Sequence, residues 1–163
     1  MTRPSTRALV AGVLAVLVVA GLAAGVVVGR RVVAQRAAAA AGEDAVAAAS
    51  QLGVNFTTLD YRTFDRDSQR VLQGATGTFK KEFAAQTGEL QQLVTTNKAV
   101  SRGKVIKAGL VSHDADSARV LLVVDADVTN TSATTPVARH YRMQVDLTRS
   151  GEQWLTDQLQ FVG

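Results

Sequence analysis

The chain has 163 residues, 47% of them hydrophobic, and carries 18 basic against 14 acidic side chains, for a formal net charge of +4. Five arginines lie within or beside one uncharged N-terminal segment, namely Arg3, Arg7, Arg30, Arg31 and Arg36. The rest of the chain holds thirteen basic against fourteen acidic residues and lacks the positive surface expected of a nucleic-acid-binding domain. The absence of cysteine excludes disulfides, thiolate nucleophiles and iron–sulfur clusters.

Residues 8–28 form a stretch without a charge, an amide or a hydroxyl. As a helix they would measure roughly 32 Å, enough to cross a hydrocarbon layer of about 30 Å. The stretch is longer than the apolar core of a removable secretory signal, which has about 7–15 residues. We therefore predict an uncleaved transmembrane helix. A cleaved signal is the alternative, because small-residue cleavage sites occur within residues 37–41.

The predicted span divides the chain into a short cytoplasmic tail (1–7), the transmembrane helix (8–28), a juxtamembrane helical linker (29–42) and an extracytoplasmic domain (43–163). Basic residues flank the span on both sides, so the positive-inside rule does not decide its orientation. We place the domain outside, because a long domain can be translocated largely regardless of its charge. The predicted location is the cell membrane, with a single pass and the N-terminus in the cytoplasm.

Gly21, Gly25 and Gly29 repeat at four-residue spacing near the end of the span. Small residues at this spacing share one helical stripe and let two helix backbones approach closely. They are therefore a candidate helix–helix contact in the membrane. The alternative is that they reflect only the abundance of glycine and alanine in this segment.

Three helices are predicted after the span. Residues 32–56 are rich in alanine, the best helix former. Their later part has an apolar stripe with helical spacing, formed by Ala45, Ala49, Leu52 and Phe56. A short helix follows Asp65, and a longer one continues to Asn97. In the longer helix Phe79 and Phe83 lie four residues apart and should face the core together.

After Asn97 the hydrophobic period becomes two, which indicates strands. In the first strand the alternation sets Val105, Lys107, Gly109 and Val111 against Lys104, Ile106, Ala108 and Leu110. It is clearest in residues 118–129, where one face holds Val120, Leu122, Val124, Ala126 and Val128. Residues 137–148 form the third predicted strand, with Tyr141, Met143, Val145 and Leu147 on its apolar face. In the fourth, residues 153–162, we expect Leu155, Leu159 and Phe161 opposite Trp154.

Three helices followed by a four-stranded antiparallel meander predict an α+β domain. The expected arrangement is an NTF2-like or cystatin-like cone, in which the helices pack on one face of a curved sheet. That superfold carries both enzymes and non-enzymes, so function has to be inferred from individual residues.

The histidines do not indicate a catalytic or metal centre. His113 falls in a polar stretch that predicts a solvated turn, and His140 falls on the polar face of its strand. Neither has the spacing of a metal site. The stretch Gly74-Ala75-Thr76-Gly77 is not a phosphate-binding loop, because the Gly-Lys-Ser/Thr ending is missing.

Two pairs of side chains, one of two carboxylates and one of a carboxylate and a phenol, are candidates for proton transfer. Asp125 and Asp127 share a strand face, and paired carboxylates can act as acid and base when burial separates their pKa values. A solvated face with Arg119 and Arg142 nearby explains them more simply. Adjacent Asp60 and Tyr61 are likewise explained by a turn cap and a core tyrosine. We therefore predict no enzyme, and no catalytic, cofactor-binding or metal-binding residues.

Several motifs, in their order along the chain, resemble the actinobacterial Mce-associated membrane proteins. After the uncharged span they are Thr58-Leu59-Asp60-Tyr61, Asp65, Gly74-Ala75-Thr76-Gly77 with Phe79 and Phe83, Val128-Thr129-Asn130, and Gly151-Glu152-Gln153-Trp154-Leu155-Thr156-Asp157. The resemblance covers almost the whole chain. It implies an accessory subunit of Mce transporters, which import lipids across the envelope. Mce subunits and membrane lipid would be its partners, and no cofactor or catalytic residue comes with it.

Three functions follow as hypotheses. The first is a scaffold whose span packs beside transporter helices while the outer domain docks on another subunit. The second is a lipid-binding module of the same system, because a cone can enclose an apolar pocket; the competing expectation is that Phe79, Phe83, Met143 and Phe161 fill the cone. The third is an inner-membrane assembly factor of a type IV secretion or conjugation apparatus.

Overall fold

The computed structural model describes residues 39–163. The predicted span, its orientation and the stripe of Gly21, Gly25 and Gly29 lie outside the described residues. Within residues 39–163 no helix is both long and apolar enough to cross a membrane. Residues 40–163 form one unit by their contacts.

Residues 39–57 form a helix, here called the N-terminal helix of the domain, which continues without interruption through Gly42 and Gly53. Its predicted apolar stripe is confirmed, because Ala45, Ala49 and Leu52 are all buried. A Cβ placed on Gly42 would lie 2.9 Å from the Leu110 side chain. Glycine at this position therefore lets the helix approach the sheet closely.

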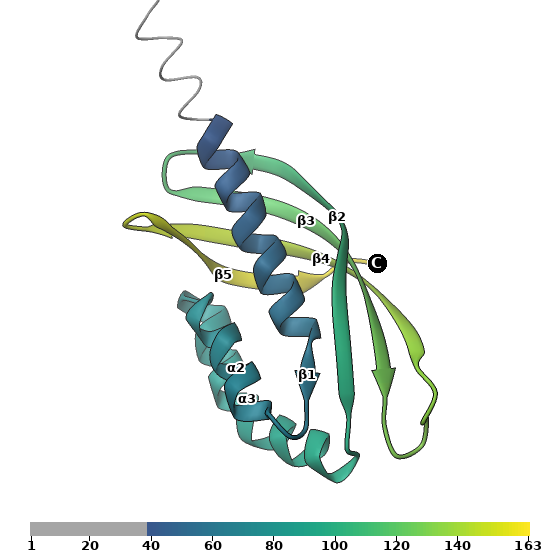
Figure 1. Ribbon diagram of the computed structural model, residues 1–163. Coiled ribbons are helices and arrows are strands. Elements are labelled where there is room, and N and C mark those ends of the chain that lie inside the picture. Colours follow the sequence, from purple (N-terminus) through teal and green to yellow (C-terminus); the bar gives the residue numbers. More distant parts are fainter. Residues whose placement is uncertain (1–38) are drawn as a thin grey trace, which may run out of the picture. The chain divides into compact units, whose positions relative to one another are not determined.

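A two-residue strand and two helices follow, labelled β1 (Leu59–Asp60), α2 (Phe64–Gln73) and α3 (Gly77–Thr96) in Figure 1. Helix α2 has Asp65 and Asp67 in its first turn and Arg70 in its last, charges that complement the helix dipole. In α3 only Phe79 and Val94 are buried. Most of this long helix therefore faces solvent.

The sheet has five antiparallel strands in the order β1-β2-β3-β4-β5, with β2 Val100–His113, β3 Ser117–Thr129, β4 Val137–Ser150 and β5 Gln153–Phe161. Figure 1 shows the sheet curving around the helix of residues 39–57. The α+β class and the curved antiparallel sheet are confirmed. The predicted number of four strands is wrong, because β1 pairs with the start of β2. Two residues are too few to show a strand periodicity.

The core lies between the N-terminal helix and the concave face of the sheet. The predicted inward residues of β3 and β4 are confirmed, and Val120, Val124, Met143 and Val145 have no exposed surface. The complete buried cluster also contains Ala45, Ala49, Leu52, Val71, Ala75, Phe79, Ala118, Leu122, Leu147 and Trp154.

Two strands depart from simple alternation. In β2 the register with β3 shifts at Ile106 and again at Val111. Beyond each shift the inward side chains belong to the other alternating set. Val105, Ala108 and Leu110 therefore share one face, contrary to the predicted sets. A register shift between β4 and β5 likewise places Trp154 in the core and leaves Leu155 only partly buried. Each bulge adds one residue to a strand and reverses the faces beyond it.

Candidate functional site

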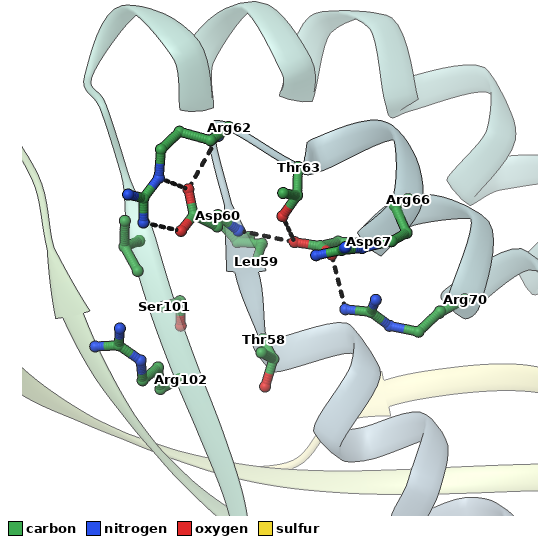
Figure 2. A pocket seen from close by; sticks show the side chains of 11 residues that line it. Thr58, Leu59, Asp60, Arg62, Thr63, Arg66, Asp67, Arg70, Ser101 and Arg102 are labelled. Atoms are coloured by element: carbon green, nitrogen blue, oxygen red, sulfur yellow. Dashed lines mark hydrogen bonds and ion pairs between the residues drawn. The ribbon is translucent and has the colours of Figure 1, made fainter.

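An open pocket of about 460 Å³ lies where the N-terminal helix ends and β1, β2 and α2 meet. Figure 2 shows the side chains that line it. Four arginines line it against two carboxylates: Arg62, Arg66, Arg70 and Arg102 face Asp60 and Asp67. The remaining lining residues are Thr58, Leu59, Thr63, Val100 and Ser101. We refer to this site as the arginine pocket.

Asp67 organises the arginine pocket. Its side chain is only 5% exposed, yet both of its carboxylate oxygens have partners. Oδ2 accepts hydrogen bonds from the backbone N–H of Asp60 and the hydroxyl of Thr63, both at 3.0 Å. Oδ1 accepts one from Nη2 of Arg70 at 2.7 Å. A buried charge is tolerated only with such pairing, so Asp67 ties β1 to α2.

Asp60 holds the turn that follows β1. Its Oδ1 accepts hydrogen bonds from the Arg62 backbone N–H at 2.9 Å and from Arg62 Nε at 2.8 Å, and Oδ2 pairs with Nη2 of the same arginine. The Arg62 side chain in turn lies over the Tyr61 ring. The hydrogen bonds from Arg62 lower the pKa of the Asp60 carboxyl to about 2. Asp60 thus holds a turn as expected, whereas Tyr61 is not a core residue: it is partly buried and lies against Arg62.

This shifted pKa predicts a pH dependence of stability. Because the pKa of Asp60 is lower in the folded chain than its usual value of 3.8, the ion pair stabilises the fold fully above about pH 4 and loses that effect as the pH falls through about 2. The difference in free energy of unfolding between the unmodified chain and Asp60→Asn should therefore shrink over this interval. Urea unfolding at several pH values, followed by the fluorescence of Trp154, measures it.

The Arg62→Gln variant provides the control for this prediction. It removes the partner that lowers the pKa, so its stability should show the same loss of pH dependence as Asp60→Asn. A stability difference that stays constant from pH 5 down to pH 2 would contradict the assignment.

Arg66 and Arg102 have the fewest hydrogen bonds and ion pairs among the four arginines of the arginine pocket. Arg66 Nε lies 3.8 Å from Asp67 Oδ1, which is an ion-pair distance but too long for a hydrogen bond. Within residues 39–163 Arg102 forms no side-chain hydrogen bond or salt bridge. Its positive charge nevertheless contributes to the lowered pKa of Asp60. The pocket therefore carries excess positive charge, with two guanidinium groups available.

The sequence did not lead us to predict the arginine pocket, because its four arginines were considered only for their contribution to the net charge. Arg66 and Arg70 lie four residues apart within α2, a spacing that places helical side chains on one stripe. That spacing was a usable signal. Arg102 comes from β2, and only the pairing of β1 with β2 brings it to the others.

The other candidate pair, Asp125 and Asp127, lies on a solvent-exposed face of β3, as favoured from the sequence. Asp125 Oδ1 lies 2.6 Å from Nδ1 of His140, and both side chains are exposed. Asp127 is exposed opposite Arg102 in the β2–β3 register. Arg119, one of the two neighbours expected from the sequence, pairs with Asp146 instead. The exposed position predicted for His140 agrees with the structure.

His113 differs from its predicted position. It ends β2 rather than lying in a solvated turn, and it is partly buried, with its ring close to Gly42. No group of three or more histidine or acidic side chains within residues 39–163 could hold a metal ion.

A smaller, apolar pocket of about 240 Å³ lies where the end of the N-terminal helix, α3 and the sheet meet. Its lining includes Phe56, Val94, Tyr141 and Phe161. Ring centroids of Phe56 lie 6.0–6.2 Å from those of Phe79, Phe83 and Phe161. Of these rings Phe79 is buried, Phe56 and Phe83 are partly buried, and Phe161 is 59% exposed. The predicted filling of the cone therefore holds for Phe79 and not for Phe161.

Comparison with known protein families identifies one match over nearly the whole chain. The family model described as "Uncharacterized protein Rv1363c/MT1408-like" matches residues 4–163. The protein Rv1363c of Mycobacterium tuberculosis is 32% identical over 128 residues, which cover 78% of this chain and 47% of Rv1363c. The chain thus spans about half the length of that relative. These matches confirm the actinobacterial part of the resemblance, and their names do not refer to Mce transport.

Solved structures show the fold of residues 39–163 in other proteins. An IcmL-like type IV secretion protein from Legionella pneumophila matches with a TM-score of 0.59 at 14% identity, over 72% of this chain and 88% of that chain. CagV, a VirB8 homologue from Helicobacter pylori, matches with 0.58 at 9% identity over 75% and 97%. A putative aromatic ring hydroxylase from Novosphingobium aromaticivorans matches with 0.51 at 15% identity over 74% and 94%. The shared fold alone does not distinguish secretion components from enzymes.

Proposed function

We propose a function from one premise: this chain belongs to the Rv1363c/MT1408-like family. The protein acts as a non-enzymatic accessory subunit of a larger cell-envelope machine. Residues 8–28 anchor it in the cell membrane, and residues 43–163 form an NTF2-like docking domain outside the cytoplasm. This domain supports the assembly or stability of the complex by binding another subunit.

The observation that carries this proposal is the likeness of the fold to type IV secretion proteins. The matching structures include the periplasmic domain of DotI, with a TM-score of 0.59 at 14% identity. The matches cover 88–97% of the IcmL-like, DotI and CagV chains. In these proteins the whole solved domain has the architecture seen here. This supports an extracytoplasmic position and favours an assembly factor of a secretion-type apparatus.

A second candidate machine is an Mce-type lipid importer, which the motif order from Thr58 to Asp157 favours. The same scaffold role would apply, with transporter subunits as partners. A lipid-binding role in that system would use the apolar pocket of about 240 Å³. That volume lies below the roughly 300–1,000 Å³ of typical small-molecule pockets, so we favour the scaffold.

The non-enzymatic role is supported by how the pocket carboxylates are used. Asp60 and Asp67 accept hydrogen bonds that hold the β1–α2 turn together. A general acid or base needs a proton-transfer partner in the substrate, whereas these carboxylates are already directed at the protein's own backbone and arginines.

Affinity purification of the full chain from native actinobacterial membranes, after crosslinking and in mild detergent, tests the function. We expect envelope-complex subunits to copurify, and their identity distinguishes the two machines: secretion ATPases indicate a secretion apparatus, and Mce or permease-like proteins indicate a lipid importer. Recovery of the chain alone would contradict the proposal, as would a freely soluble mature form that lacks residues 1–38.

A further inference from the structure

We propose that the arginine pocket binds an acidic segment of a partner protein, whose carboxylates pair with Arg66 and Arg102. This inference rests on the proposed docking function and specifies the chemistry of the partner. Guanidinium groups present several N–H donors in a planar arrangement that matches carboxylates. The pocket offers four of them against two carboxylates of its own.

The two carboxylates of the pocket pair mainly with Arg62 and Arg70 and leave the guanidinium groups of Arg66 and Arg102 available. Asp60 is paired with Arg62, and Asp67 is paired with Arg70 at 2.7 Å. Arg66 is 69% exposed and only loosely paired. Arg102 is exposed and has no side-chain partner within the described part of the chain. An incoming acidic group can therefore bind these arginines without breaking an existing hydrogen bond.

The arrangement favours several linked carboxylates over a single anion. Figure 2 shows Arg62 and Arg102 on one side of β1, and Arg66 and Arg70 on the other. The two sets come from different elements, because Arg66 and Arg70 belong to α2 whereas Arg102 belongs to β2. An extended acidic segment that crosses β1 would reach the arginines on both sides of the strand, whereas a single phosphate group would reach those on one side only.

The anchoring of the pocket reduces the entropic cost of binding. The Asp60 N–H donates a hydrogen bond to Asp67 Oδ2 and fixes α2 relative to β1. The hydrogen bonds from Thr63 and Arg70 hold the Asp67 carboxylate itself in place. Pairing with Val100 and Ser101 fixes β1 relative to β2. The arginines thus extend from a rigid frame, and less conformational freedom is lost when a partner binds.

The position of the pocket favours a protein over lipid headgroups. The helix of residues 39–57 has its first described residue at one end and the pocket beside its other end. These ends are separated by about 27 Å of helix. The described part of the chain thus begins at the end of this helix remote from the pocket, and the open pocket at the other end is left accessible to a second protein.

Binding of a labelled hexaglutamate peptide to the full chain, held in uncharged detergent at low salt, tests this inference by fluorescence anisotropy. Arg66→Gln and Arg102→Gln should each weaken binding roughly threefold, the size expected for one exposed ion pair. The double variant should weaken it roughly tenfold, because separated sites add. The matched control is Arg142→Gln, an exposed arginine on β4 that does not line the pocket, and it should bind normally.

Three results would overturn the inference. They are an unchanged affinity in the double variant, an equal loss in Arg142→Gln, and preferential binding of phosphatidylglycerol vesicles or inorganic phosphate that depends on Arg66 and Arg102. Unchanged Trp154 fluorescence in each variant shows that folding is intact. Peptide binding at the pocket without any copurifying complex would refute the proposed function alone. A copurifying complex without arginine-dependent peptide binding would refute this inference alone.

Discussion

A chain in which Gly103 is replaced by alanine is expected to lose roughly 3 kcal/mol of its free energy of unfolding. A Cβ at this position would lie 1.8 Å from Thr57 Oγ1 and 2.7 Å from Thr57 Cβ. Thr57 cannot rotate away freely, because its hydroxyl donates a hydrogen bond to the Gly53 carbonyl at 2.7 Å. The alanine must therefore push β2 away from the end of the N-terminal helix.

Separation of β2 from the helix would also weaken two hydrogen bonds. The Ser101 hydroxyl donates to the Thr57 carbonyl at 2.6 Å, and the Gly103 N–H donates to the Thr58 hydroxyl at 3.0 Å. Both bonds join β2 to the residues beside the arginine pocket. Gly103→Ala should accordingly weaken binding of the acidic peptide as well as stability.

Gly109→Ala is the matched control, because Gly109 lies on the same strand and a Cβ there would meet nothing within 4 Å. Its free energy of unfolding should change by less than about 0.5 kcal/mol. Urea unfolding followed by Trp154 fluorescence measures both variants. Equal stabilities of Gly103→Ala and Gly109→Ala would show that the helix end and β2 are not packed as described.

The second large effect is expected from the inward face of β3. Leu122 is 1% exposed and belongs to the buried cluster. Leu122→Ala should lower the free energy of unfolding by about 2–5 kcal/mol, because it removes buried methyl groups and leaves a cavity between the sheet and the N-terminal helix. The same denaturation experiment measures this loss.

Leu121→Ala makes the same chemical change one residue earlier on the strand. Leu121 is 43% exposed on the opposite face, so its replacement should cost less than about 1 kcal/mol. If the two variants were equally destabilised, or if Leu121→Ala were the worse of the two, the assignment of the two faces of β3 would be wrong.

Residue patterns were sufficient to predict the buried side chains wherever one face of a regular helix or strand is buried. Val120, Leu122 and Val124 alternate along β3 without interruption, and all three are buried as expected. Ala45, Ala49 and Leu52 likewise have helical spacing and pack into the core. In such elements burial selects apolar residues at a fixed period, so the sequence alone contains the information.

The same patterns did not predict the buried side chains where a bulge interrupts the two-residue alternation of a strand. The bulges at Ile106 and Val111 reverse the faces of β2, and the sequence has no glycine or proline at either residue to signal them. Strand β1 was missed because pairing with Val100 and Ser101, rather than any local preference, makes Leu59 and Asp60 a strand. Contacts between distant segments decide both features.

By itself the sequence determined the α+β class, the order of helices and strands, and the inward faces of β3 and β4. These follow from local periodicity, which each segment carries independently of its neighbours. Only the tertiary structure decided where the charged side chains meet. Arg102 reaches the pocket of Arg62, Arg66 and Arg70 because β2 pairs with β1. Charged surface residues leave no periodic signal of their partners, so their assembly into a site depends on the complete fold.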